Sequence, residues 1–201
     1  MNRRVTVAIT GASGVIYAVR LLRYFLTHAY EVDFIISDAG KINFKVEMDW
    51  DLDKKGIVEF LKNKFGHDID KGKLREWPVQ AIAAPMASGS MRRLGMVVVP
   101  CSMKTLSGIA HGASTNLIER AADVALKENF PLIIVPRETP MNSIQIENML
   151  TLSKAGARIV PAMPAFYQKP QSIDDIADFI VARILHMLGI DDHGLFQPWG
   201  G

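Results

Sequence analysis

The sequence predicts a doubly wound α/β fold, in which helices cover both faces of one parallel sheet. Five short apolar runs rich in β-branched residues recur along the chain, and each ends in small or turn-forming residues. Helical patterns of apolar residues lie between most of these runs. The runs are apolar almost throughout, which is typical of parallel strands that are buried on both faces. We therefore expect a Rossmann-like or flavodoxin-like sheet.

The expected strands are, in order, "VTVAIT" (5–10), "VDFIIS" (32–37), "MVVVP" (96–100), "LIIVP" (132–136) and "ARIVP" (157–161). The clearest helical patterns cover residues 14–28, 116–129, 141–156 and 172–189. In the last of these, Ser172 suits an N-cap, Asp174 and Asp175 suit the first helical turn, and Gly189 suits the end.

Residues 41–95 fit this alternation less well. Residues 51–66 read as a helix, but 71–95 read as an irregular excursion that contains Trp77. A segment of that length without regular structure is more often a functional loop than a passive connection. The sequence shows neither internal repeats nor a low-complexity linker, so we expect residues 1–201 to form a single domain.

Composition excludes several classes of protein. The 201 residues include 23 Lys and Arg against 21 Asp and Glu, and a net charge of +2 gives no support to nucleic-acid binding. The apolar runs are too short for a membrane span, and the N-terminus turns polar too early for a signal peptide. The single cysteine, Cys101, excludes an internal disulfide and fits a reducing compartment, so we expect a cytoplasmic protein. The histidines show no metal-ligand spacing, and we expect no metal site.

Polar and small residues follow every expected strand. The strand ends read "TGASG", "SDAG", "PCSMKT", "PRETP" and "PAMPAFY". In open parallel sheets, ligands bind at the carboxyl ends of the strands, where helix N-termini present free N–H groups. Arg137 and Glu138 lie at such an end, and charges at the tip of a buried strand need partners. Thr139 as N-cap and Pro140 as first helical residue would begin the next helix.

The first turn, "TGASG", is of the type that binds phosphates or nucleotides, because Gly11 and Gly14 permit a tight bend and close backbone approach. Alone it is a weak signal, and a plain strand-to-helix turn explains it about as well. The second strand ends in Ser37 instead of the acid that grips a ribose, which argues against NAD and suits a flavin's ribityl phosphate. Ser102 and Thr105 offer further hydroxyls, or simply cap a helix.

Several basic residues have both a functional and a structural interpretation. Arg120 and Lys127 are seven apart in one helix and could share an anion, although a solvated face with Asp123 as the partner of Lys127 is the better reading of that pair alone. Arg183 borders the apolar stripe of the last helix, where snorkelling would explain it. Glu47 is a surface acid, or a base if its segment folds over the site. Cys101 reads as a packing residue.

Taken together, these motifs resemble the UbiX-type flavin prenyltransferases, within the flavin-containing cysteine-decarboxylase superfamily. The resemblance runs through "TGASG", "ASGS", "PCSMKTLSG", "LIERAADVALKE", "PRETP", "ENML", "PAFYQKPQS" and "VARIL", in the family's order. An older name for such proteins is 3-polyprenyl-4-hydroxybenzoate carboxy-lyase. The element "PMNS" is similar to one in the related peptidyl-cysteine decarboxylases, so it does not separate the two branches.

The resemblance implies a single flavoprotein domain that binds reduced FMN and dimethylallyl phosphate. It further implies a homo-oligomer, expected to be a dodecamer, with sites shared between subunits. The prenylated FMN would pass to a UbiD-type decarboxylase. The implied FMN-binding residues are Gly11, Ala12, Ser13, Ser37, Ser102, Met103, Lys104, Thr105 and Arg137. The implied donor-binding residues are Lys127, Tyr167, Arg183, Arg120, Ser88, Gly89 and Ser90.

The resemblance also implies roles in catalysis. The flavin N5 attacks the allylic carbon as phosphate leaves, and the ring then closes onto the flavin C6. Glu138 would serve as acid and later as base among the cations, which include Lys127, and Glu47 would take the C6 proton. Trp199, or else Trp77, would face the allylic cation. The Asp-rich Mg²⁺ motifs of diphosphate-using prenyltransferases do not occur here, so we expect metal-independent chemistry.

Two other functions remain open from the sequence. An FMN-dependent oxidative decarboxylase would need a histidine near the first helix, but the surroundings of Tyr17 offer none before His28. A flavin carrier without chemistry of its own would explain the flavin turns, but it would leave Lys127, Glu138 and Arg183 without a purpose.

Overall fold

The computed structural model describes residues 3–195. Its centre is a parallel sheet of six strands in the order β3-β2-β1-β4-β5-β6. The strands are β1 (Arg4–Ile9), β2 (Glu31–Ile36), β3 (Lys73–Trp77), β4 (Gly95–Cys101), β5 (Leu132–Pro136) and β6 (Arg158–Ile159). The direction of the winding reverses between β1 and β4, as in Rossmann folds, and this confirms the predicted fold class.

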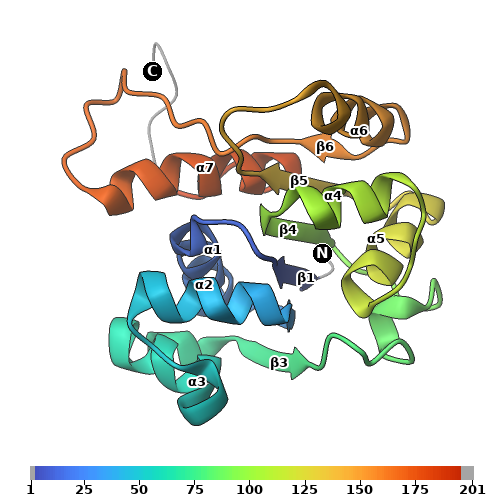
Figure 1. The fold of residues 1–201 in the computed structure, drawn as a ribbon. Coiled ribbons are helices and arrows are strands. Elements are labelled where there is room, and N and C mark those ends of the chain that lie inside the picture. Colours follow the sequence, from blue (N-terminus) through green and yellow to red (C-terminus); the bar gives the residue numbers. More distant parts are fainter. Residues whose placement is uncertain (1–2, 196–201) are drawn as a thin grey trace.

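Helices cover both faces of this sheet (Figure 1). They are α1 (Val15–Thr27), α2 (Asp38–Met48), α3 (Leu52–Phe65), α4 (Met103–Ala110), α5 (Leu117–Lys127), α6 (Ser143–Lys154) and α7 (Ile173–Met187), with short 3₁₀ helices η1 (Gly66–Lys71) and η2 (Pro85–Ala87). Core residues of α1, α2, α3 and α7 share one apolar cluster, and those of α4, α5 and α6 share the other. The two clusters lie on opposite faces because successive side chains of a strand alternate between faces.

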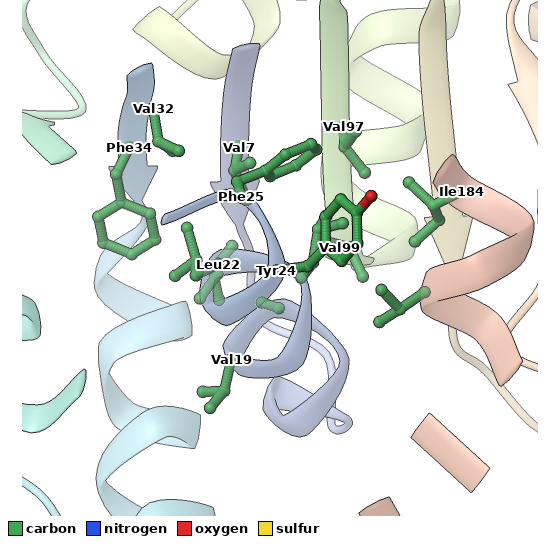
Figure 2. Close-up of a cluster of buried hydrophobic side chains, with 14 of the residues drawn as sticks. Val7, Val19, Leu22, Tyr24, Phe25, Val32, Phe34, Val97, Val99 and Ile184 are labelled. Carbon is green, nitrogen blue, oxygen red and sulfur yellow. The ribbon is translucent and has the colours of Figure 1, made fainter. Parts of the chain in front are cut away.

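Helix α1 is central to the first cluster (Figure 2). Leu22 and Phe25 of α1 are fully buried against the sheet, in a cluster that contains Val7 of β1 and Val97 of β4. Ile184 of α7 joins the same cluster and is also fully buried. The apolar face of α1 thereby packs across the β1–β4 pair, where the strand order reverses.

Residues 71–95 contain a strand that the sequence pattern did not reveal. Strand β3 pairs with β2 at the edge of the sheet, with Leu74 opposite Val32. Its other residues are mostly charged and partly exposed, which suits an edge strand and conceals it in a search for apolar runs. Helix α2 was not predicted either, and the predicted strand 157–161 reduces to the two residues of β6.

The predicted start of α6 at Thr139 and Pro140 was wrong. The N-cap is Asn142, whose side chain accepts a hydrogen bond from the Gln145 N–H at 3.0 Å. The Gln145 side chain in turn accepts from the Asn142 N–H at 3.0 Å, so the two residues form a reciprocal capping box. The Thr139 hydroxyl instead donates to the carbonyl of Glu138 at 2.7 Å.

A buried charged cluster joins the strands to the segment before β4. The Asp33 carboxylate accepts from Arg4 Nε at 2.7 Å, from Arg4 Nη2 at 2.9 Å and from the Trp77 indole N–H at 2.9 Å. Arg93 Nη1 lies 4.0 Å from the same carboxylate and donates to the Thr6 hydroxyl at 2.6 Å. Burial lowers the pKa of Arg93. Trp77, at the end of β3, therefore contributes a hydrogen bond to this cluster.

Replacing Asp33 by alanine should be strongly destabilising. The change leaves Arg4 and Arg93 without their shared counter-ion, and a broken buried ion pair costs about 3–5 kcal/mol. Urea unfolding measures the free energy of unfolding of each variant. Asp68→Ala is the matched control, because that carboxylate is 72% exposed and should contribute less than about 1 kcal/mol. Equal losses in the two variants would contradict the account of the cluster.

Candidate functional site at the carboxyl ends of the strands

The turn after β1 has no room for side chains at its two glycines. A Cβ on Gly11 would lie 2.6 Å from the Cβ of Ala39, at the start of α2. Gly14 has φ +106°, in the left-handed region, and a Cβ there would lie 2.8 Å from the Tyr17 ring. Glycine is therefore required at both positions by packing, and at Gly14 also by the backbone conformation. The turn brings bare backbone to the sheet edge.

Glu47 of α2 binds this turn. Its carboxylate accepts from the Gly14 N–H at 3.0 Å and from the Val15 N–H at 2.8 Å. Gly14, the N-cap of α1, carries no side chain that could cap the helix, so Glu47 supplies the capping oxygens and an acid at the positive end of the dipole. The structure thus places Glu47 at the predicted site instead of on a remote surface.

Thr10, the residue after β1, joins the turn of β1 to that of β4. Its hydroxyl donates to the Pro100 carbonyl at 3.0 Å, and its oxygen accepts from the Ser102 N–H at 2.7 Å. Ser102 is the N-cap of α4 and accepts from the Thr105 N–H at 3.3 Å. Thr10 is fully buried, and sequence reasoning missed its role. The available signal was a hydroxyl residue at the end of an otherwise apolar run.

Arg137 joins the turn of β5 to the other two. Its backbone N–H donates to the Cys101 carbonyl at 3.4 Å, and its Nε donates to the Ser13 carbonyl at 3.3 Å. Glu138 is half-buried, and its Oε1 accepts from the Thr139 N–H at 3.0 Å. The three turns that follow β1, β4 and β5 therefore converge at one edge of the sheet. The charged residues at the end of buried strand β5 therefore lie at this edge, where Arg137 binds the other two turns.

Two further hydroxyl residues frame the edge. Ser37 is half-buried and caps α2, where its side chain accepts from the Gly40 N–H at 3.1 Å. Tyr17 packs over Gly14, and burial raises the pKa of its phenol, opposed by Arg137 and reinforced by Glu47. The pattern of α1 predicted Tyr17 only as a helical residue, because the nearness of Glu47 and Arg137 to its phenol depends on the tertiary fold.

Cys101 lies beside this edge as a packing residue. Cys101 is fully buried, and burial raises the pKa of its thiol well above the ordinary value, as expected for a packing residue. Among residues 3–195, no group of three His, Cys, Asp or Glu side chains is arranged to hold a metal ion. No helix in the same range is long and apolar enough to cross a membrane.

Lys127 and the segment 88–90 lie at the opposite edge of the sheet. Lys127 is the last residue of α5, five residues before β5 begins at Leu132, so it lies at the amino ends of the strands. The segment 88–90 precedes β4 at the same edge, and a Cβ on Gly89 would lie 2.2 Å from the Glu128 carboxylate. The structure places Gly89 against Glu128, which pairs with Lys127, and within one chain it separates Lys127 and the segment 88–90 from the three turns.

The charges on α5 form local pairs. Arg120 Nη1 donates to Asp123 at 2.9 Å, and Lys127 Nζ lies 3.7 Å from Glu128. The expected pair of Asp123 with Lys127 is therefore replaced by the pair with Arg120, three residues away on the same helix face. Both pairs are substantially exposed, so each contributes little to stability.

Arg183 belongs to α7, and Tyr167 belongs to the segment before it. Near its start, this segment is bound to the end of β5 by a hydrogen bond from the Ala162 N–H to the Pro136 carbonyl at 3.1 Å. The Tyr167 ring packs edge-on against Phe179, with 6.1 Å between ring centres. Tyr167 and Arg183 are both exposed. Trp199, the first candidate for the aromatic face, lies outside the described residues.

Known proteins of similar sequence cover the whole chain. The model of the Flavoprotein family matches residues 1–185. A flavin prenyltransferase UbiX of Alkalihalophilus pseudofirmus is 50% identical over 201 residues, which are 100% of this chain and 98% of that protein. The flavin prenyltransferase UbiX of Pseudomonas aeruginosa is 48% identical over 199 residues, with 98% and 94% of the two chains covered.

Solved structures agree with this likeness. AnUbiX (PadA1), crystallised with FMN and dimethylallyl pyrophosphate, superposes with a TM-score of 0.86 at 37% identity and covers 100% of this chain and 99% of its own. A dodecameric FMN-dependent UbiX-like decarboxylase from Escherichia coli O157:H7 superposes with a TM-score of 0.84 at 37% identity, with 98% and 100% covered. These findings confirm the resemblance seen in the motifs: the chain belongs to the Flavoprotein family and, within it, to the UbiX-type flavin prenyltransferases.

Proposed function

We propose that this protein transfers a dimethylallyl group from dimethylallyl phosphate to N5 and C6 of reduced FMN, and that the prenylated FMN serves a UbiD-type decarboxylase. The observation that carries the proposal is the convergence of the three turns after β1, β4 and β5, in a chain 50% identical to a flavin prenyltransferase. The solved relative that holds FMN together with dimethylallyl pyrophosphate supports this pair of substrates.

The converging turns fit an FMN. The bare backbone at Gly11 and Gly14 admits a ligand closely, and the N-termini of α2 and α4 offer N–H groups beside the Ser37 and Ser102 hydroxyls. Arg137 adds a cation at the same edge. We assign FMN binding to Gly11, Ala12, Ser13, Ser37, Ser102, Met103, Lys104, Thr105 and Arg137. Reduced FMN, when bound, supplies the nucleophilic N5 and C6.

Two carboxylates at this edge suit the two proton transfers. We assign Glu138 as the acid that protonates the departing phosphate and later as a base, because it is half-buried at the strand end beside Arg137. We assign Glu47 as the base that takes the C6 proton. Backbone N–H groups of Gly14 and Val15 hold the Glu47 carboxylate in place at this edge.

The prenyl donor requires residues from both edges of the sheet. We assign its binding to Lys127, Tyr167, Arg183, Arg120, Ser88, Gly89 and Ser90, with Lys127 also assisting catalysis and Trp199 facing the allylic group. Strand β4 has seven residues, so about 20 Å separate the edge with Lys127 from the edge with Glu138. A site with both residues therefore needs neighbouring subunits. The dodecameric solved relative supports a homo-oligomer, which we propose to be a dodecamer.

Two further assignments accompany this function. We propose that residues 1–201 form one flavoprotein domain, since a single sheet is flanked by both apolar clusters. We also propose a cytoplasmic location, because the lone cysteine is buried and reduced. An FMN-dependent decarboxylase is the second candidate, because one solved relative carries that name. The histidine it would need near the first helix is still missing, since His28 lies at the far end of α1.

The decisive experiment is anaerobic incubation of the protein with reduced FMN and dimethylallyl phosphate, followed by mass spectrometry of the extracted flavin. We expect the flavin to gain one five-carbon unit, with or without a chelator. A parallel reaction with dimethylallyl diphosphate identifies the preferred donor. An unmodified flavin with both donors would reject the transferase and leave the decarboxylase or the carrier.

Replacing Gly14 by alanine should abolish FMN binding. The new methyl group would meet the Tyr17 ring at 2.8 Å and also strain a backbone at φ +106°. Fluorescence titration with FMN measures the affinity. Gly112→Ala is the matched control, because Gly112 has φ +63° but no neighbouring atom within 4 Å. That variant should lose about 1 kcal/mol of stability and keep its FMN affinity. Similar FMN affinities in both variants would argue against the turn as the flavin site.

Replacing Glu138 by glutamine should slow catalysis while FMN binding stays near normal. The amide preserves the acceptor for the Thr139 N–H but cannot donate a carboxylic proton to the leaving phosphate. A positioned general acid contributes about 10²–10⁴-fold. Single-turnover kinetics with bound reduced FMN measure the chemical step. An unchanged rate would remove Glu138 from the mechanism.

A further inference from the structure

The relative placement of α1 and α7 determines how the donor-binding residues lie relative to the flavin turn of the same chain. Helix α1 directly follows the turn that holds Gly11 and Gly14. Helix α7 carries Arg183, and the segment before it carries Tyr167. The two helices lie on the same face of the sheet and share one apolar cluster (Figures 1 and 2). Any shift between them would move the donor-binding residues relative to the flavin.

A buried arginine links the two helices. Arg20 of α1 is only 9% exposed. Its Nε donates to Asp178 Oδ1 at 2.7 Å, its Nη2 donates to Asp178 Oδ2, and its Nη1 donates to Asp174 Oδ2 at 2.8 Å. Asp178 and Asp174 both belong to α7, one helical turn apart. The bond with Asp178 raises the pKa of Arg20, so the guanidinium stays charged.

This ion pair constrains the two helices in a way that their apolar contact does not. The rest of the shared cluster is made of aliphatic and aromatic side chains, such as Leu22 of α1 and Ile184 of α7. Apolar packing of this kind tolerates repacking at small cost. A two-pronged guanidinium–carboxylate pair instead fixes both distance and direction. Arg20 therefore constrains the position of α7 along and around α1.

The constraint extends to Tyr167 through the next residue of α7. Phe179 follows Asp178 directly, and its ring packs edge-on against Tyr167 at 6.1 Å between ring centres. The contacts run from the flavin turn through α1 to Arg20, then to Asp178, Phe179 and Tyr167. We propose that Arg20 is a positioning residue that holds Tyr167 and α7 in register with the flavin turn for donor binding. The inference rests on the proposed function of Tyr167.

Stability alone does not account for such a pair. Buried ion pairs are weak stabilisers, because replacing both partners by apolar residues of similar size is often neutral or stabilising. Asp178 is 16% exposed and Asp174 44% exposed, so both carboxylates can be hydrated once Arg20 is replaced. The variant Arg20→Met should thus remain folded while it loses the directional constraint. This separates a positioning role from a stabilising one.

The test compares Arg20→Met with Arg23→Met. Arg23 lies on the same helix, but its guanidinium lies over the ring of Phe65, 5.1 Å from the ring centre. Phe65 belongs to α3, so Arg23 contacts a different helix from α7. For Arg20→Met we expect KM for dimethylallyl phosphate to rise about tenfold, since a displacement of ~1 Å can cost up to about 100-fold. The Kd for FMN should stay within about twofold of the wild-type value. The flavin turn lies before α1, whereas the bonds of Arg20 act on α7. Arg23→Met should leave both constants unchanged.

Further variants keep the outcome interpretable. Arg20→Lys restores the charge without the fork and should retain most of the KM defect. If Arg20→Met does not fold, Asp178→Asn tests the same link with a side chain of the same shape. An unchanged KM in the folded variant, or an equal loss of FMN affinity, would overturn the positioning role. Formation of prenylated FMN by the wild-type protein tests the proposed function separately. An unchanged KM for the donor in Tyr167→Phe would reject the assignment of Tyr167 to donor binding instead.

Discussion

The site depends on the pair of hydrogen bonds that Thr10 makes between the ends of β1 and β4. At this point the winding of the sheet reverses, so the connections that leave the two strands go to opposite faces and open a crevice. A buried hydroxyl that both donates and accepts fixes the two turns on either side of that crevice. Arg137 then attaches the β5 turn to the same edge. Together with the pairing of β1 and β4, these bonds hold the glycine turn and the N-terminus of α4 in one defined geometry.

Electrostatics at this edge follow from the helices as well as from the charged side chains. The N-termini of α1, α2 and α4 all face it, because each helix begins directly after a strand ends. Such termini attract anionic groups. One of them, that of α1, already holds the carboxylate of Glu47. The N-termini of α2 and α4, where Ser37 and Ser102 act as caps, therefore suit a ligand phosphate.

The two edges of the sheet divide the chemistry. The carboxyl edge holds the glycine turn, Arg137, Glu138 and Glu47, which suit a flavin and proton transfer. The amino edge holds Lys127 and the segment 88–90, packed together at the end of α5. Between these edges, segment 78–94 runs along α5, from the bond between Leu117 and Val79 to the contact of Gly89 with Glu128. This division is the reason that the proposed donor site needs neighbouring subunits.

Much of the fold could be predicted from the sequence, because buried parallel strands are apolar throughout and end in small residues. The α/β class and the central strands are examples. Strand β3 could not be found by this means, since an edge strand such as "KLREW" carries charges on its exposed face. The start of α6 was misplaced because two capping signals follow each other, and the reciprocal box of Asn142 and Gln145 prevailed over Thr139 and Pro140.

The site was predicted in part for similar reasons. The strand-end motifs identified the carboxyl edge, because ligands bind there in any open parallel sheet. The roles of Thr10 and Arg20 depend on contacts between residues far apart in the sequence, which no local pattern encodes. The separation of Lys127 from Glu138 likewise emerges only once α5 is seen to end at the start of β5. Motif order along a chain does not reveal which residues share a subunit's site.

Subunit mixing tests the central claim, that one site draws Glu138 from one subunit and Lys127 from another. The two inactive variants Glu138→Gln and Lys127→Ala are prepared separately, dissociated, mixed and reassembled, and prenylated FMN is then measured. Mixed oligomers contain some sites with both native residues, so activity should return to a substantial fraction of that of wild-type protein treated in the same way. If the mixture stays as inactive as each variant alone, while wild-type protein recovers, the two residues do not meet across subunits and the account is contradicted.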